Sequence, residues 1–541
     1  MREVEALPTH PMGRFFFGRD FPYTSGRMRL PRRSVIFVFV VIALMLSFVE
    51  ARPAMPDPDS FYHAKMALTI RDQGFIRSFP WLQETVMRDE YVNAHWLYHV
   101  LLIPFVTAFD PLVGIKVSAV LFGLTAFYAL YRLLRSIGSP YPEWLTLVGA
   151  LSFDFLQRMS LPKAGSLSVA LLIFAVWAML NRRFRMLSAI AILYVWLYHG
   201  WPVLLAAFAC LVLGDIVSRQ LAPSDKPPFS AQLGEWVKTA GAMAAGLVVG
   251  MVVNPYFPTN VAFTVVDILK IAVIGKVDIP VGTEWYPIAW TTMFQNEILA
   301  LATFGLALVA FIPAGASKAF HLSRERVRST FALLFLAALF AAFTFRSIRY
   351  MEYFVPFLLL TTGSIFAIVK PFLRQEVEPW LLHVWRTTPR LAAATIAFLS
   401  LAVASLALGS VDYSYAKTGY FSASQYEGSA RWLKRYLPRN EIVFNALWDS
   451  SLAYFYLDDS HYFLVGLDPR FMYDNDKDRY QAWFDLQSGK DADVSKIETF
   501  FHASAVLVDR RLKGDFVKNL EASGQFEKTY EDEWTKIYIP R

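Results

Sequence analysis

The stretch RMRLPRRSVIFVFVVIALMLSFVEARPAMPDPDS (27–60) decides the class of fold. It places a basic cluster directly before an apolar run at 34–49, and two aspartates, Asp57 and Asp59, follow that run closely. An apolar run of about this length, with positive charges on one flank, is typical of a retained transmembrane helix. The sequence therefore predicts a membrane anchor whose far end carries two acidic side chains.

The rest of the chain is also rich in apolar runs and poor in charged residues. Of its 541 residues, 55% are hydrophobic and 18% are charged, whereas soluble proteins carry about 25% charged residues. The lone Cys210 rules out a disulfide framework or a cysteine metal site. We expect a polytopic α-helical membrane protein of about 11 to 13 transmembrane helices. Further apolar runs lie near 111–131, 143–157, 164–180, 186–198, 202–217, 238–253, 296–314, 328–345, 350–369 and 391–409.

Short basic segments occur in every second connection between these runs. Because Lys and Arg favour cytoplasmic loops, they predict a cytoplasmic N-terminal segment (1–33) and external loops at 51–110 and 254–295. The net charge of +7 then reflects membrane orientation, and we expect no nucleic-acid partner. We expect a multi-pass protein of the cell (inner) membrane, surrounded by lipid. The basic segments are RLLRS (132–136), NRRFR (181–185), KAFHLSRERVR (318–328) and KPFLRQ (370–375).

The final part of the chain has a different composition. A transmembrane domain is expected over 34–409, followed by an external, periplasmic-side α/β domain over 410–541, because charged residues become frequent and short β-like runs appear. These runs are EIVFN (441–445), HYFLVG (461–466), SAVLVDRR (504–511) and TKIYIP (535–540). The stretch GDFVKNLEASGQFEK (514–528) has a helical pattern.

Asp57 and Asp59 are the first candidates for chemistry. Two carboxylates this close repel each other unless a cation or a proton lies between them. Mg²⁺ and Mn²⁺ are the hard cations that prefer such oxygen ligands. An alternative interpretation is that Asp59 caps a helix over 60–74.

Four further motifs follow in order. They are HGWPV (199–203), VGTEWYPIAWTTMF (281–294), RYMEYFVPF (349–357) and LWDSS (447–451). With the two aspartates, they resemble motifs of the catalytic subunit of oligosaccharyltransferase, a GT-C membrane glycosyltransferase, of which this chain would be a divergent bacterial-type member. The match rests on the spacing of Pro287 and Trp290 after Glu284 and of Pro356 after Arg349.

The resemblance implies a site at the outer face of the membrane. Asp57, Asp59 and Glu284 would be the catalytic and metal-binding residues, with Mg²⁺ or Mn²⁺ as the cofactor. The substrate-binding residues would be Arg349, His199, Trp448 and Asp449. From the residues alone, Arg349 also fits a cation at a helix end, Glu284 a solvated loop charge, and His199 a hydrogen-bonded residue in a tight turn.

Two departures from the family pattern bear on the reaction. A second acidic motif is expected shortly after Arg158, but Gly165 and Leu167 stand there; Asp154 is an alternative carboxylate, or else an ion-pair partner of Arg158. LWDSS keeps only the Trp and Asp of the family's WWDYG signature, which weakens the pocket for a Ser or Thr acceptor.

The resemblance predicts a glycosyltransferase that moves a glycan from a polyprenyl-phosphate-type carrier to a protein acceptor. The two departures favour a glycolipid or polysaccharide acceptor as the alternative. A third hypothesis is a transporter of lipid-linked sugars, although transporters place ionisable groups near the bilayer midplane, and the acidic groups here lie in loops.

Overall fold

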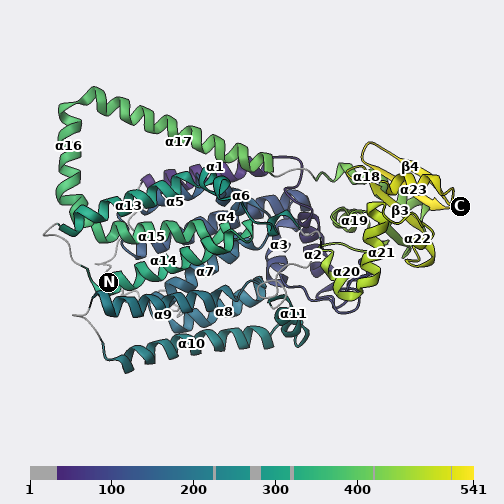
Figure 1. Cartoon of the computed structure of the whole chain (residues 1–541), viewed down its shortest axis with the longest axis horizontal. Coiled ribbons are helices and arrows are strands. Elements are labelled where there is room, and N and C mark those ends of the chain that lie inside the picture. Colours follow the sequence, from purple (N-terminus) through teal and green to yellow (C-terminus); the bar gives the residue numbers. More distant parts are fainter. Residues whose placement is uncertain are drawn as a thin grey trace, which may run out of the picture.

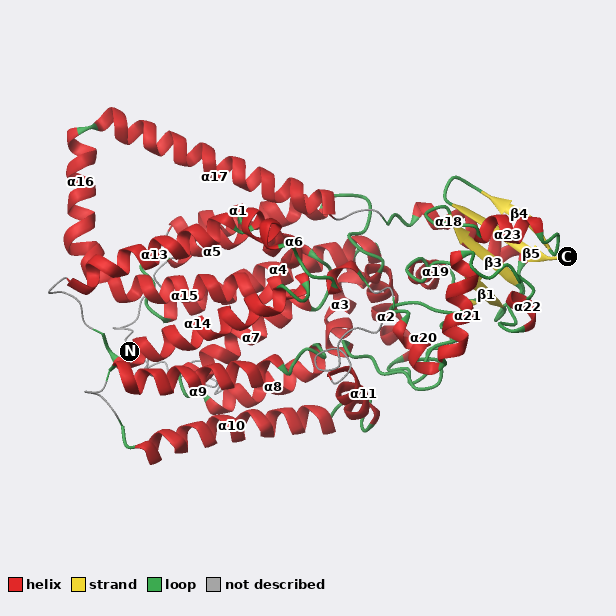
Figure 2. Ribbon diagram, viewed as in Figure 1, coloured by secondary structure: helices red, strands yellow, loops and turns green. Residues whose placement is uncertain are grey.

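The structure is a computed structural model that describes residues 33–222, 227–268, 279, 282–316, 322–417, 421–512 and 514–541. A bundle of helices forms one end of the molecule, and a small α/β domain forms the other (Figure 1). Among the described residues, strands occur only in the small domain (Figure 2). The predicted N-terminal segment lies outside the described residues, except for Arg33.

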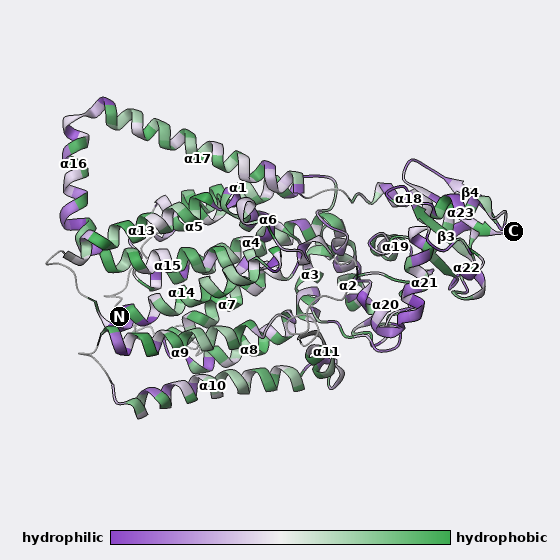
Figure 3. Cartoon of the chain, viewed as in Figure 1, coloured by the Kyte–Doolittle hydropathy of each residue, from purple (hydrophilic) through white to green (hydrophobic). Residues whose placement is uncertain are grey.

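The bundle contains the membrane-spanning helices. Among the described residues, seven helical stretches are long and apolar enough to cross a membrane, and the chain is a multi-pass membrane protein. Hydrophobic residues predominate along most of these helices (Figure 3). They are α1 (Arg33–Glu50), α4 (Pro111–Ser136), α9 (Val203–Leu221), α13 (Ile298–Ala316), α14 (Arg324–Thr344), the stretch Ile348–Thr387 and α17 (Pro389–Lys417). The stretch Ile348–Thr387 contains α15 (Met351–Phe372), η6 (Leu373–Val377) and α16 (Glu378–Thr387).

The other bundle helices are shorter or more polar. Each predicted apolar run falls on helix, but the run at 143–157 is divided into α5 and α6. The chain also bends by 108° between α6 and α7; counting that pair as one span gives eight spans in the described part. The predicted runs also include α8 (Phe184–Leu197), whose 14 residues reach roughly 21 Å, less than the hydrocarbon thickness. The remaining bundle elements are α5 (Pro142–Ala150), α6 (Phe153–Ser160), α7 (Gly165–Leu180), α10 (Phe229–Val252), α11 (Thr259–Ile268) and α12 (Trp290–Asn296).

Helices α8 and α10 pack against each other through small residues. A Cβ atom on Gly246 would lie 2.4 Å from the Ser188 carbonyl oxygen and 2.8 Å from the Ala191 Cβ. The Trp196 indole also donates a hydrogen bond of 2.8 Å to the Gly250 carbonyl oxygen. Glycine at these positions therefore lets the two backbones approach closely.

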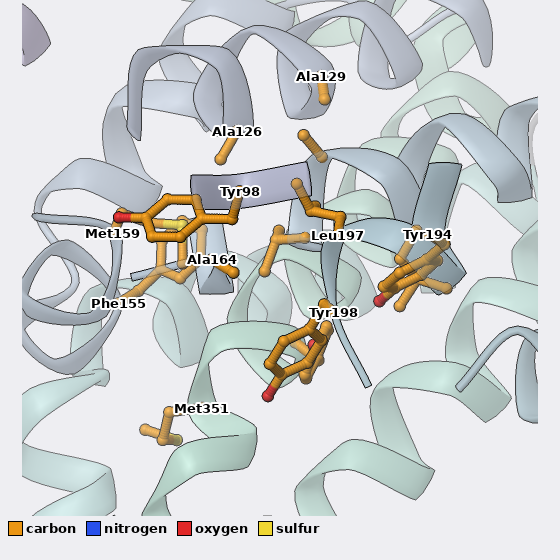
Figure 4. Packing of buried hydrophobic residues seen from close by; sticks show 14 of the residues in the cluster. Tyr98, Ala126, Ala129, Phe155, Met159, Ala164, Tyr194, Leu197, Tyr198 and Met351 are labelled. Atoms are coloured by element: carbon orange, nitrogen blue, oxygen red, sulfur yellow. The ribbon is translucent and has the colours of Figure 1, made fainter. Parts of the chain in front are cut away.

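A continuous buried core runs through the bundle. It reaches the helix ends that face the small domain, where aromatic and sulfur-containing side chains fill the space. Figure 4 shows part of this core, including Tyr98, Phe155, Met159, Tyr198 and Met351. The side chains of Arg158 and Arg349 therefore extend from a tightly packed part of the bundle.

The small domain is built on a five-stranded sheet in the order β2-β1-β3-β5-β4. Strands β2, β1 and β3 are parallel, while β5 and β4 are antiparallel additions. The four predicted strands are present. The stretch predicted as helical (514–528) contains a helix over Phe516–Ala522, but its last three residues begin β4, which was not predicted. The strands are β1 (Ile442–Asn445), β2 (Tyr462–Phe463), β3 (Ala505–Asp509), β4 (Phe526–Glu531) and β5 (Thr535–Pro540). The helices are α18 (Ser424–Tyr436), α19 (Ser451–Leu457), α20 (Arg470–Asn475), α21 (Lys477–Ser488), α22 (Lys496–Thr499) and α23 (Phe516–Ala522).

The first long loop joins the bundle to this domain. It contains α2 (Asp59–Gln73) and α3 (Trp96–Ala108), and its middle part lies beside β2, where Leu82 pairs with Phe463. The Phe463 amide donates to the Trp81 carbonyl at 2.9 Å, and the Gln83 amide donates to the Phe463 carbonyl at 2.7 Å. Lys65 of α2 also pairs with Asp459 at 2.7 Å. The small domain and the aspartate-bearing loop are thus directly connected.

Candidate functional site

Asp57 and Asp59 lie at the start of α2, at the end of the bundle nearest the small domain. The Asp57 Oδ1 accepts a hydrogen bond of 3.1 Å from the Ser60 amide, so Asp57 satisfies an N–H group in the first turn of α2. Asp59 is the first residue of α2, and in the described part of the chain no backbone N–H group of the helix donates to its side chain. The capping role predicted for Asp59 therefore belongs to Asp57, and the Asp59 carboxylate faces another partner.

That partner is Lys163, which lies in the break between α6 and α7. Its Nζ is 2.8 Å from Asp59 Oδ2 and 3.5 Å from Asp57 Oδ2. The Lys163 side chain is 18% exposed, so the ion pair is half-buried and still open on one side. Lys163 was not predicted as a site residue; its only signal in the sequence is a single lysine in the short connection LPKA (161–164).

Glu284 is held between two arginines. Arg158 Nη1 lies 2.7 Å from Glu284 Oε2, and Arg349 Nη1 lies 3.2 Å from Glu284 Oε1. Glu284 is on the short helix η4 (Thr283–Trp285) and Arg349 is on η5 (Ile348–Tyr350). Glu284 is therefore ion-paired on both sides at the centre of the site. The alternative interpretation, a solvated loop charge, does not describe it.

The backbone fixes the two short helices against each other. The Ile348 amide donates to the Tyr286 carbonyl at 3.0 Å, and the Ser347 hydroxyl donates to the Glu284 carbonyl at 2.8 Å. The Arg349 guanidinium stacks over the Trp285 ring at 4.8 Å and hydrogen-bonds the Tyr198 hydroxyl. Contacts with the other site residues therefore fix the Arg349 side chain. The alternative interpretation, a cation that extends from a helix end toward water, does not describe it.

A second buried carboxylate, Glu352, completes this group. Its Oε2 lies 3.0 Å from Arg158 Nη2, and its side chain is 1% exposed. A Cβ atom on Gly165 would lie 3.0 Å from the same Oε2. Glu352 of α15 therefore supplies a carboxylate beside the position where the family pattern led us to expect one from α7.

The ion pair predicted between Asp154 and Arg158 is replaced by other contacts. Asp154 accepts hydrogen bonds from the Tyr413 hydroxyl at 2.6 Å and from Asn296 at 3.0 Å. Arg158 instead binds Glu284 and Glu352. Asp154 therefore connects α6 to α17, and no contact in the described part of the chain brings it to the Asp57/Asp59 pair.

The environment sets the charge of these groups. Burial raises the pKa of Asp57 to about 6, and Asp59 and Glu284 add to this rise, while Lys163 opposes it. Burial alone would also raise the pKa of Glu284, but Lys163, Arg349 and Arg158 hold it well below its usual range. Glu284 is consequently ionised at neutral pH, and Asp57 titrates just below neutrality.

Four histidines line the site beneath the carboxylates. His199 Nδ1 lies 3.2 Å from His95 Nε2, and His63 Nδ1 lies 2.8 Å from His99 Nε2. The His95 ring stacks on Tyr198 with ring centroids 5.5 Å apart. Burial is the main cause that lowers the pKa of His63 and His95, so both imidazoles are neutral. His199, predicted to contact substrate, therefore belongs to a hydrogen-bonded group next to Arg349.

Trp448 and Asp449 lie apart from this cluster, in the turn between β1 and α19. The Asp449 carboxylate is bound by both terminal nitrogens of Arg511, at 2.8 and 3.1 Å. Arg511 also binds Asp509 at 2.7 Å. Trp448 packs on the core of the small domain. No hydrogen bond or ion pair within the described residues joins Trp448 or Asp449 to Glu284.

The predicted metal ligands do not fit a divalent cation in this arrangement. Lys163 already contacts both aspartates, and both Glu284 oxygens face arginines. Among the described residues, no group of three or more His, Cys, Asp and Glu side chains has a geometry that would hold a metal ion. The expectation of Mg²⁺ or Mn²⁺ at Asp57, Asp59 and Glu284 is therefore not supported by the donor set.

Comparison with known proteins identifies the fold. No family model and no curated protein matches the chain. Among solved structures, the Archaeoglobus fulgidus oligosaccharyltransferase in the apo form aligns with a TM-score of 0.57 at 12% identity, covering 88% of this chain and 69% of that one. The oligosaccharyltransferase AglB of the same organism, in complex with an inhibitory peptide and a dolichol-phosphate, gives a TM-score of 0.56 at 11% identity over the same shares of both chains.

A bacterial enzyme matches over nearly its whole length. ArnT from Cupriavidus metallidurans, bound to undecaprenyl phosphate, aligns with a TM-score of 0.53 at 12% identity, covering 94% of this chain and 98% of that one. These proteins share the GT-C glycosyltransferase fold, and the chain described here has that fold. The similarity of this chain to them is one of fold.

Proposed function

We propose that this protein is a membrane glycosyltransferase that transfers a glycan from a polyprenyl-phosphate-type carrier to a protein acceptor, at the external side of the cell membrane. The observation that carries the proposal is the joined set of charges at one end of a GT-C bundle. Asp59, Lys163, Glu284 and Arg349 come from four separate connections between helices and form one continuous group. Such a group of partly buried charges marks a functional site.

The donor is proposed from the site chemistry and from the solved relatives. Arg349 presents a planar guanidinium that binds phosphate oxygens through paired hydrogen bonds, and its side chain is 15% exposed. Two of the aligned structures hold dolichol-phosphate or undecaprenyl phosphate. A transferase outside the cytoplasm lacks nucleotide sugars, so a sugar carried on a lipid phosphate fits both the location and the arginine.

The orientation follows from charge. In Figure 1 the helix connections alternate between the two ends of the bundle. Arg132 and Arg135 end α4 and Arg182 precedes α8, at the end away from the small domain, whereas Asp59 and Lys163 lie at the end beside it. The positive-inside rule places the first end in the cytoplasm. The site and the small domain would then face outward.

Among the acidic residues, Asp59 is the proposed catalytic base. Its carboxylate is 30% exposed and makes no helix-capping contact, so it can approach an acceptor. Asp57 is more buried and satisfies the backbone of α2. Glu284 would hold Arg349 and Arg158 in place and would contact the acceptor.

A glycolipid or polysaccharide acceptor is the second candidate, and one contact favours it. Arg511 occupies both oxygens of Asp449, so Asp449 is not free to bind a peptide in this arrangement. The third hypothesis, a transporter, is disfavoured because the Asp57/Asp59 pair lies beyond the end of α1 rather than midway along a membrane helix.

The test compares cells with the intact protein, a deletion, Asp59→Asn and Glu284→Gln. Asp72→Asn is the matched control, because Asp72 is an exposed acid on the same helix. Mass spectrometry of glycoproteins and of glycolipids should show a glycan that is lost in the deletion and in both site variants but kept in the control. If both site variants restore every lost glycan, the proposed site is wrong. Loss confined to glycolipid would identify the second acceptor class.

A further inference from the structure

The Asp57/Asp59 pair already contains a positive charge supplied by the chain. Lys163 Nζ lies 2.8 Å from Asp59 and 3.5 Å from Asp57, in the place where two adjacent carboxylates require a cation. We propose that Lys163 is a catalytic residue that takes the place of a divalent metal ion, so that glycan transfer proceeds without one. This inference rests on the proposed function and concerns the same site.

The charges around the site support this assignment. Burial alone would lower the pKa of Lys163, but Asp57, Asp59 and Glu284 raise it, so its ammonium stays protonated at physiological pH. A divalent ion between the aspartates would have to displace this ammonium or lie beside it. Placing two positive charges in one half-buried position costs more free energy than either alone. The lysine and the metal ion therefore exclude each other.

The residues near Lys163 also lack a carboxylate that could bind a metal ion. Where the family pattern expects an acidic motif, α7 begins with Gly165, and Leu167 follows. The nearby carboxylate of Glu352 is bound to Arg158 at 3.0 Å and is 1% exposed, so it cannot act as an open metal ligand. Lys163 thus stands two residues before Gly165, where the resemblance led us to expect a carboxylate.

Lys163 has donors to spare for a substrate. An ammonium group carries three N–H donors, and Asp59 accepts one of them at 2.8 Å. A phosphate oxygen of the donor can accept another, because the lysine side chain remains 18% exposed. Lys163 and Arg349 would then face the same phosphate from two sides, and both would stabilise its growing negative charge.

The transfer step is balanced without a metal. A lone pair of the acceptor nucleophile forms a bond to the anomeric carbon of the sugar. The bond between that carbon and the phosphate oxygen breaks, and its electron pair stays on the oxygen, which Lys163 and Arg349 hold. The acceptor proton passes to the Asp59 carboxylate.

Manganese binding tests the assignment directly, without any sugar substrate. The purified full-length protein, washed with EDTA and returned to metal-free buffer, is titrated with Mn²⁺ and followed by electron paramagnetic resonance. Any Mn²⁺ binding that is also seen with Asp59→Asn comes from other sites on the protein. This binding is subtracted from the Mn²⁺ binding measured for the intact protein and for each variant. We expect no Asp59-dependent binding to the intact protein. In Lys163→Met, the uncompensated aspartates should bind Mn²⁺ about tenfold more tightly or better, which corresponds to about 1.4 kcal/mol.

Two controls make the result decisive. Lys163→Arg keeps the positive charge and should not gain binding. Lys65→Met removes another α2-side ion pair, that with Asp459, and should also gain none. Asp59-dependent Mn²⁺ binding to the intact protein would overturn the proposal, and so would a folded Lys163→Met that gains none. If Lys163→Met does not fold, as judged by gel filtration, binding by the intact protein and by Lys163→Arg still decides the question.

Activity separates this inference from the proposed function. In isolated membranes, EDTA should leave the glycan product of the intact protein unchanged, and loss of that product on EDTA treatment with recovery on adding Mn²⁺ would overturn the role of Lys163. By contrast, glycans that persist in Asp59→Asn cells would overturn the proposed function while leaving the Mn²⁺ titration interpretable.

Discussion

The replacement Arg158→Met should be strongly destabilising, because it leaves a carboxylate buried without a counter-charge. Arg158 is 9% exposed, and it binds Glu284 at 2.7 Å and Glu352 at 3.0 Å. Glu284 keeps a second partner, Arg349, but Glu352 is 1% exposed and loses the ion pair. Removing one partner of a buried ion pair costs about 3–5 kcal/mol. We expect the free energy of unfolding to fall by this amount.

The double variant Arg158→Met/Glu352→Met isolates the electrostatic cause. Replacing both members of a buried pair with apolar groups is often neutral, so the double variant should recover most of the lost stability. Unfolding in detergent, followed by tryptophan fluorescence during titration with a denaturing detergent, measures both. Arg71→Met is the matched control, since Arg71 forms an exposed pair with Asp72, and its stability should stay close to that of the parent. A double variant as unstable as the single one would refute the reasoning.

Three further predictions concern separate parts of the molecule. Because burial raises the pKa of Asp57 to about 6, protonation removes its charge as the pH falls, and glycan transfer in membranes should decline through pH 6; a decline only near pH 4 would contradict this. Arg349→Lys keeps the charge but loses the paired donors, so transfer should fall about tenfold, or 1.4 kcal/mol, whereas the exposed Arg346→Lys should retain activity. Gly246→Leu should lower the free energy of unfolding by about 1–3 kcal/mol, because its Cβ would meet a backbone oxygen of α8 at 2.4 Å. Gly241→Leu on the same helix, with nothing within 4 Å, should not.

The helices could be predicted from the sequence because burial in lipid imposes one simple requirement. Long apolar runs are needed wherever a helix crosses a membrane, so each predicted run falls on helix. Strand β4 was missed for the opposite reason. Its sequence FEKTYE is charged and its burial is slight, so pairing with β5 decides its conformation, and that long-range contact leaves no local pattern.

The candidate site was predictable only in part. Asp57, Asp59, Glu284 and Arg349 stand in recognisable motifs, and the structure brings them into one neighbourhood. Lys163 belongs to no motif, and Glu352 lies within RYMEYFVPF without being one of the residues on which the match rests. The importance of both residues comes from the charged side chains that the fold places next to them. In the sequence, Glu352 is one of many residues on an apolar helix. Only the folded structure places Arg158, 194 positions earlier, beside it. Spacing along the chain cannot reveal a pair that only folding creates.

Contacts between the two ends of the molecule hold the helix that carries Asp59, and a further ion pair holds Asp449 of LWDSS. Helix α2 carries Asp59 at its first residue and Lys65 one and a half turns later, and Lys65 pairs with Asp459 of the small domain. The adjoining loop also pairs its backbone with β2. Asp449, by contrast, is held inside the small domain by Arg511. The two regions also touch, because α19 begins at Ser451 of LWDSS and packs on α2, where the Tyr456 ring lies 5.9 Å from the Phe61 ring. Arg511 therefore fixes Asp449 within the small domain, while α19 and the Lys65–Asp459 ion pair hold the helix that carries Asp59.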